Sequence, residues 1–102
     1  MSEAPASDLF MSRVGALLKG QALEISPLAA GIMVAIEMGI ADSRSFSRQL
    51  GVEHALVLRE ISQHSGPDGL IRVTGRQAKT LRTSLALSAR GELLLTQTQH
   101  IR

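Results

Sequence analysis

Basic side chains are concentrated in the last third of the chain, and binding of phosphate groups is the chemistry that they could perform. Residues 1–68 carry five Lys or Arg and eight Asp or Glu, whereas residues 69–102 carry six and one. A surface that binds a nucleic acid has this composition, because its cations neutralise phosphates. A solvated basic surface without a partner has the same composition. Between Asp68 and Glu92 there is no acid, and the cations are Arg72, Arg76, Lys79, Arg82 and Arg90.

Other groupings of reactive side chains do not form a convincing site. His64, Ser65 and Asp68 lie close together, but in a turn with glycine and proline, where no geometry of nucleophile and base can be inferred. Cysteine is absent, and the remaining histidines, His54 and His100, are scattered without the spacing of metal ligands. We therefore predict no enzymatic activity, no catalytic residue, no metal and no cofactor. The lack of cysteine also fits a reducing cytoplasm.

The length of 102 residues suits one domain, which we expect to span residues 8–102 after a disordered tail at residues 1–7. The tail does not resemble a secretory signal, because no basic region followed by an apolar run is present. The apolar stretch 25–41 contains Pro27 and Glu37 and is shorter than the roughly 20 apolar residues of a membrane span. We expect a buried helix there, no membrane association and a cytoplasmic protein.

Capping residues predict two helices in the first part of the chain. The first runs from about Asp8 to Lys19, with Ser7 as its N-cap and Gly20 at its end. The second begins at Ser26 and Pro27, because proline suits the first turn of a helix. Its apolar stripe consists of Leu28, Ile32, Ala35 and Ile36.

A helix-turn-helix is predicted next. Residues 45–50 form a short helix capped by Ser45, and Gly51 can adopt the positive φ of a turn. A further helix from about Glu53 to His64 carries apolar residues four positions apart, at Val57 and Ile61. Two short helices joined across a glycine are typical of this motif.

A β-hairpin and a last helix follow a loop at residues 65–69. Residues 70–74 and 81–87 predict two strands joined by a polar, flexible tip at residues 75–80. Alternation along the second strand places Leu81, Leu85 and Leu87 toward the core and Arg82 outward. Ser88 then caps a helix over about residues 89–99. Its adjacent leucines, residues 93 to 95, exceed what one buried seam needs, so we expect one to face a partner.

This order of elements resembles that of the MarR-like winged helix-turn-helix regulators, and in chain length the protein is closer to the ArsR-like regulators. The similar segments are Ser45-Phe-Ser-Arg-Gln-Leu-Gly-Val52, Gly69-Leu-Ile-Arg-Val73 and Leu85-Ala-Leu-Ser-Ala-Arg-Gly-Glu92. The resemblance implies a mainly α fold with a small β-hairpin: a winged helix-turn-helix of about five helices and a two-stranded wing. It also implies a transcriptional regulator that binds pseudo-palindromic double-stranded DNA as a homodimer. The helix after Gly51 would enter the major groove, with the wing beside the minor groove.

The resemblance, together with the charge pattern, selects two sets of residues. The chain lacks room for the long paired terminal helices of MarR-like regulators, so a dimer interface would come from the first and last helices, at Phe10, Val14, Leu17 and Leu94. The expected DNA contacts are Arg48, His54, Arg59, Gln63, Arg72, Arg76, Lys79 and Arg82. No small-molecule effector is assigned, and the metal sensing of ArsR-like regulators is not implied without cysteines.

The alternative is a winged-helix module that binds a protein partner and does not bind DNA. Its support lies in the predicted reading helix, which carries consecutive apolar residues from Leu56 to Leu58 together with Glu53 and Glu60. Acidic side chains repel phosphates, and apolar ones suit a protein interface. Fold alone does not decide between the two functions.

Overall fold

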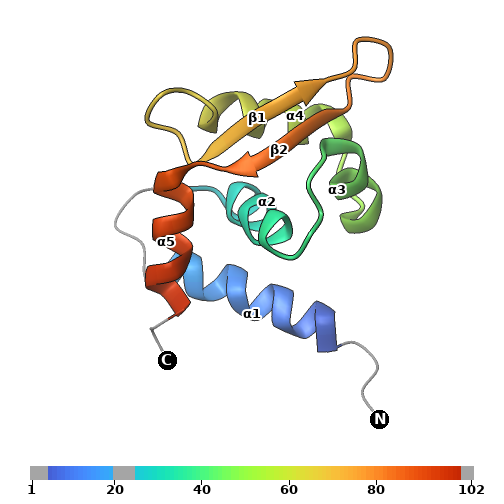
Figure 1. The fold of residues 1–102 in the computed structure, drawn as a ribbon. Coiled ribbons are helices and arrows are strands. Elements are labelled where there is room, and N and C mark those ends of the chain that lie inside the picture. The colour runs from blue at the N-terminus through green and yellow to red at the C-terminus, as the bar shows by residue number, and fades with distance from the viewer. Residues whose placement is uncertain (1–4, 20–24, 100–102) are drawn as a thin grey trace.

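The computed structural model describes residues 5–19 and 25–99 (Figure 1). Across these residues, five helices and one two-stranded antiparallel hairpin form a mainly helical fold of the winged helix type, as the sequence predicted. The hairpin is the wing. The elements are α1 (Pro5–Lys19), α2 (Pro27–Glu37), α3 (Ser43–Leu50), α4 (His54–His64), β1 (Ile71–Arg76), β2 (Thr83–Leu87) and α5 (Ala89–Gln99).

Helix α2 is the centre of the core. It lies between α1 and the hairpin (Figure 1), and residues 29–35 are all buried. Such a helix, apolar on every side, suits a position covered from several directions. No helix within the described ranges is both long and apolar enough to cross a membrane. The largest core side chains are Phe46, Leu17, Ile32, Met33, Ile71 and Leu95.

The two N-terminal helices confirm one capping prediction and correct another. Ser26 is the N-cap of α2, because its Oγ accepts a hydrogen bond of 3.0 Å from the Ala29 amide. Helix α1 begins at Pro5, so Ser7 lies inside the helix and residues 5–7 are not a disordered tail. The predicted end at Gly20 lies outside the described residues.

Helix α3 begins earlier than predicted because Asp42, and not Ser45, is its N-cap. The Asp42 carboxylate accepts hydrogen bonds of 2.9 Å from both the amide and the hydroxyl of Ser45. Asp42 also pairs with Ser84 of β2 in an isolated bridge, which joins the start of α3 to the hairpin. At the other end of α3, Gly51 has a φ of +67°, as the turn required.

The tip of the hairpin lies two residues later than the predicted 75–80, because β1 extends to Arg76 and β2 begins only at Thr83. Strand β2 begins at Thr83, which is buried, whereas Leu81 lies in the tip with a φ of +60° and 56% of its surface exposed. The left-handed backbone at Leu81 interrupts the alternation, so the prediction that it faces the core is wrong. Leu85 is buried and Leu87 partly buried, as predicted.

Helix α5 is clamped to the loop before β1. The Ser88 hydroxyl donates to the Gly69 carbonyl at 2.8 Å, and its oxygen accepts from the Gly91 amide at 3.0 Å, which confirms Ser88 as the N-cap. The Ser88 amide donates to the Leu70 carbonyl at 3.1 Å. A Cβ at Gly91 would overlap that carbonyl oxygen, so only glycine fits.

Candidate nucleic-acid interface

The two sides of α4 differ in polarity. Val57 and Ile61 are buried against the core, while Arg59 and Gln63, one turn apart, are exposed on the other side. The remaining exposed residues of this helix face are small, apolar or uncharged. Arg59 is therefore the cation that α4 presents to solvent. The other exposed residues are Ala55, Leu56 and Ser62.

Of the two acids near α4, Glu60 is turned away from this face. Its carboxylate accepts a hydrogen bond of 3.0 Å from Ser26 Oγ and lies 3.7 Å from His64 Nε2, and its side chain is only 18% exposed. Glu53, just before the helix, is exposed. The consecutive apolar residues are divided as well, because Val57 is buried and Leu58 packs against the core. Only Leu56 is substantially exposed.

The predicted cations of the hairpin fall into two groups. Arg72, Arg76 and Lys79 are exposed: Arg72 lies on the outward side of β1, Arg76 lies at its end, where it pairs with the buried Thr83, and Lys79 lies in the tip. Arg82 is only partly exposed, because its Nε lies 3.7 Å from Oδ1 of Asp42. Its role is therefore to attach the hairpin to α3 as well as to contribute charge. Arg48 is exposed in the last turn of α3.

A groove of about 270 Å³ separates α4 from the tip of the wing. Arg76 lines it from the wing and Ser62 lines it from the exposed side of α4, so the two predicted DNA-binding elements meet there. On the side of α4, Leu58 and Ile61 make its lining apolar. The other lining residues are Gln77, Ala78, Leu81 and Thr83.

The wing tip is held in place, in contrast to the flexible tip expected from its polar sequence. Arg44 on α3 donates from Nε and Nη2 to the Thr80 carbonyl, at 3.0 and 2.7 Å. Within the tip, the Leu81 amide donates to the Gln77 carbonyl at 2.8 Å, and the Gln77 amide donates to the Arg82 carbonyl at 2.9 Å. Sequence reasoning missed Arg44. The predicted helix over residues 45–50 left Arg44 outside it, whereas α3 begins at Ser43.

His54 belongs to the contacts between α3, α4 and the wing, and this position corrects the expectation that it contacts DNA. Its Nε2 lies 2.8 Å from the buried hydroxyl of Ser43, which accepts a hydrogen bond of 2.9 Å from the Thr83 amide. The Ser43 hydroxyl thus joins His54 to the first residue of β2. Burial lowers the pKa of His54, and the charge of Arg44 lowers it further, against the opposing effect of Asp42.

Asp42 remains ionised at this junction. Burial raises its pKa, but the hydrogen bonds from Ser45 and the charge of Arg82 together outweigh that effect, so that the pKa lies below its ordinary value. A carboxylate that is hydrogen-bonded in the folded state favours the charged form. The negative charge of Asp42 thus interacts with Ser45 of α3 and Arg82 of the wing, and not with a ligand.

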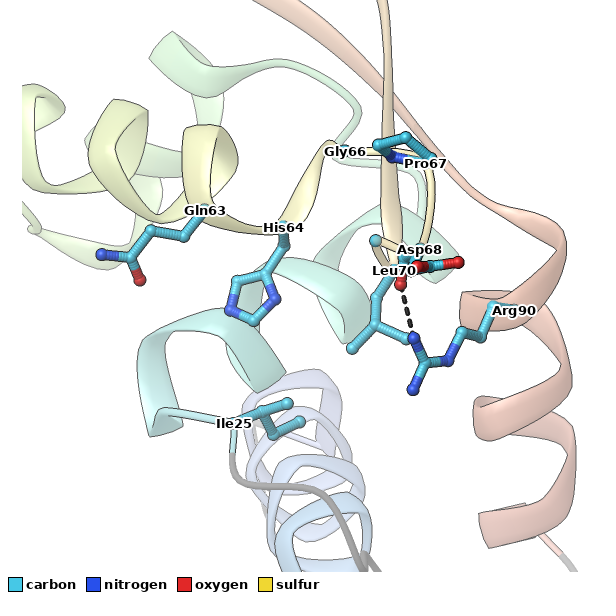
Figure 2. Close-up of a pocket in the computed structure, with 9 residues that line it drawn as sticks. Ile25, Gln63, His64, Gly66, Pro67, Asp68, Leu70 and Arg90 are labelled. Atoms are coloured by element: carbon cyan, nitrogen blue, oxygen red, sulfur yellow. Dashed lines mark hydrogen bonds between the residues drawn. The ribbon is translucent and has the colours of Figure 1, made fainter.

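A second depression, of about 440 Å³, lies between the C-terminal end of α4 and α5 (Figure 2). Arg90 crosses it and donates from Nη1 to the Asp68 carbonyl, the dashed line in Figure 2. His64 is next to Glu60, and the Ser65 hydroxyl donates to the Ser62 carbonyl at 3.4 Å, so neither is arranged as nucleophile and base. Among the described residues, no group of three or more His, Cys, Asp or Glu could hold a metal ion.

The predicted dimer residues are mostly engaged within the chain. Val14 and Leu17 are buried in its own core, so they present no surface to a second copy and the interface must be revised. Phe10 and Leu94 are partly buried and pack against that core. The exposed apolar side chains of the same two helices are Leu9, Met11 and Leu93.

No protein-family model matches the chain, and no curated protein is significantly similar to it. The geometry of the chain is therefore the basis for a functional assignment.

Proposed function

We propose that this chain is a transcriptional regulator of the winged helix-turn-helix type, MarR-like or ArsR-like, that binds duplex DNA as a homodimer in the cytoplasm. One observation carries the proposal: Arg76 of the wing and Ser62 on the exposed face of α4 border the same groove. In this arrangement α4 enters the major groove and the wing lies beside the minor groove. The proposal involves no catalysis and assigns no effector.

The side chains at this surface suit the chemistry of DNA. Arg59 can bind guanine, Gln63 can bind adenine, and the exposed Leu56 can contact a thymine methyl group, each in the major groove. Arg76 and Lys79 reach phosphates, which position a protein without reading sequence. The inward position of Glu60 supports the proposal, because it removes an acid from the face that would approach the phosphates.

A homodimer would present two copies of α4 to successive turns of the major groove, about 34 Å apart. The exposed apolar side chains of α1 and α5, Leu9, Met11 and Leu93, are the surface that a second copy would cover. We expect Leu93→Glu to dissociate the dimer, as light scattering coupled to size exclusion would show. Its affinity for a palindromic site would then fall.

A protein-binding module without DNA binding is the second candidate. Leu56 and Leu81, 44% and 56% exposed, favour it, because both lie on the elements that border the groove. The exposed cations on the same elements favour DNA. The two functions differ in their dependence on salt, which provides the test.

The test is a titration of mixed-sequence duplex, followed by fluorescence anisotropy at several salt concentrations. Each phosphate contact contributes about one to the slope of log affinity against log salt, so the Arg76→Gln, Lys79→Gln variant should lower the slope by about two. Arg90→Gln is the matched control, because Arg90 lies in the same acid-free stretch but at α5, far from the tip (Figure 1). Equal slopes for the two variants, or no binding at low salt, would contradict the proposal.

A further inference from the structure

The tip of the wing holds a leucine in a backbone conformation that leucine does not favour. Leu81 has a φ of +60°, the one positive φ outside glycine among the described residues. Hydrogen bonds enforce it: the Leu81 amide donates to the Gln77 carbonyl at 2.8 Å, and the Leu81 carbonyl accepts from the Thr83 hydroxyl at 3.1 Å. Glycine or asparagine would adopt this conformation at lower cost.

The side chain of Leu81 also gains little by burial, since 56% of its surface is exposed. A leucine at this position is thus unfavourable to the fold both through its backbone and through its exposure. Residues kept in such conformations cluster at sites where another molecule binds. Arg76 and Lys79 are exposed beside Leu81, so the molecule that binds here should be negatively charged.

We propose that Leu81 is an apolar wedge that enters the minor groove of duplex DNA and kinks it at a base step. This inference rests on the proposed function and adds a residue that the charge pattern does not reveal. Apolar side chains inserted between base pairs unstack them partially and bend the duplex, while neighbouring cations bind the phosphates. Steps such as TA and CA, which unstack easily, are the preferred sites.

The anchoring of the tip suits this role. Insertion requires a side chain whose position is set before DNA arrives, because ordering a loop on binding costs affinity. Arg44 binds the Thr80 carbonyl directly before Leu81, and Ser43 binds the Thr83 amide just after it. The leucine is therefore presented by a tip that α3 holds on both sides.

The experiment compares the full chain with Leu81→Asn on a duplex that carries a donor and an acceptor dye at its ends. Asparagine accommodates the positive φ, so the variant should unfold at the same temperature or higher, whereas a leucine needed for packing would cause a fall. Met38→Ala is the control, because Met38 is also an exposed apolar residue, at 36%, and it lies at the C-terminal end of α2, outside the proposed DNA and dimer surfaces. Wild type and control should bend the duplex by about 20° or more.

We expect Leu81→Asn to leave the duplex straight and to bind about tenfold more weakly, because it loses the burial of most of a leucine side chain. A variant that binds and bends DNA like wild type would overturn the wedge and leave the proposed function intact. So would a lower unfolding temperature, which would assign Leu81 to the fold. Failure of wild type to bind any duplex at low salt would remove the proposed function itself.

Discussion

Ser26 Oγ donates a hydrogen bond of 3.0 Å to Oε1 of Glu60, which joins the start of α2 to the middle of α4. The same oxygen accepts from the Ala29 amide, so one hydroxyl caps α2 and positions an acid of the proposed reading helix. Glu60 thus lies beside the N-terminus of α2, where a helix dipole favours negative charge. The contact turns the acid away from the face proposed to approach DNA.

Exchanging Glu60 for glutamine should therefore change the stability of the fold, whereas exchanging Glu53 should change the affinity for DNA. Glu60→Gln should lower the free energy of unfolding by about 1 kcal/mol, since a charge-assisted hydrogen bond is weakened, and should leave DNA affinity within about twofold. Glu53→Gln, at an exposed site, should leave stability unchanged and raise affinity. Urea unfolding and anisotropy check the two results. A rise in affinity for Glu60→Gln alone would show that Glu60 faces the DNA.

Burial of His54, together with the nearby charge of Arg44, predicts that stability falls in mild acid. The pKa of His54 in the folded chain lies below its ordinary 6.5, so the unfolded chain binds the proton first. Stability is complete above that ordinary value and declines as the pH drops below it. Asp42, whose ordinary value is 3.8 and whose folded pKa is also lowered, adds a further loss only at lower pH.

The measurement is urea unfolding of wild type and His54→Gln between about pH 5 and 8, a window above the titration of Asp42. Glutamine keeps an amide that can form a hydrogen bond with Ser43 but does not titrate. The difference in unfolding free energy between the two proteins should therefore shrink as the pH falls. A difference that stays constant would mean that His54 has equal proton affinity in both states.

Two glycines in helices should respond in opposite directions to alanine. Gly91→Ala places a Cβ on the Leu70 carbonyl and should cost about 2 kcal/mol of stability, because the clamp between α5 and the preceding loop must open. Gly15 on α1 is exposed, and a Cβ added there would have no atom within 4 Å, so Gly15→Ala should stabilise by up to about 1 kcal/mol. Thermal unfolding of both variants tests this prediction. It is wrong if the two unfolding temperatures shift in the same direction by the same amount.

Arg44→Ala should loosen the wing tip with little effect on overall stability. The guanidinium is partly exposed, so its two hydrogen bonds to the Thr80 carbonyl should contribute less than about 1 kcal/mol. Hydrogen exchange at the amides of Leu81 and Gln77 should accelerate, because both close the tip. Arg44→Lys serves as the control that retains charge. Unchanged exchange in both variants would show that the tip holds its shape without Arg44.

Local chemistry was sufficient to predict most element boundaries, and it failed where a distant residue decided the outcome. Ser26, Ser88 and Gly51 act through neighbours within a few positions, and each occupies the predicted place. Asp42 replaced Ser45 as the cap of α3, and its carboxylate also lies 3.7 Å from the distant Arg82. Leu81 left its expected strand because the tip closes through Gln77 and Thr80.

The sequence by itself determined the order of helices and hairpin and the concentration of positive charge at the wing, since periodicity, caps and charge are local properties. Tertiary structure decided which of those residues are available to a partner. In the folded chain, Val14 and Leu17 are buried, His54 is hydrogen-bonded to Ser43, and Glu60 is hydrogen-bonded to Ser26. These outcomes depend on contacts between residues far apart in the chain, and packing around α2 selects them. A linear pattern does not contain that information.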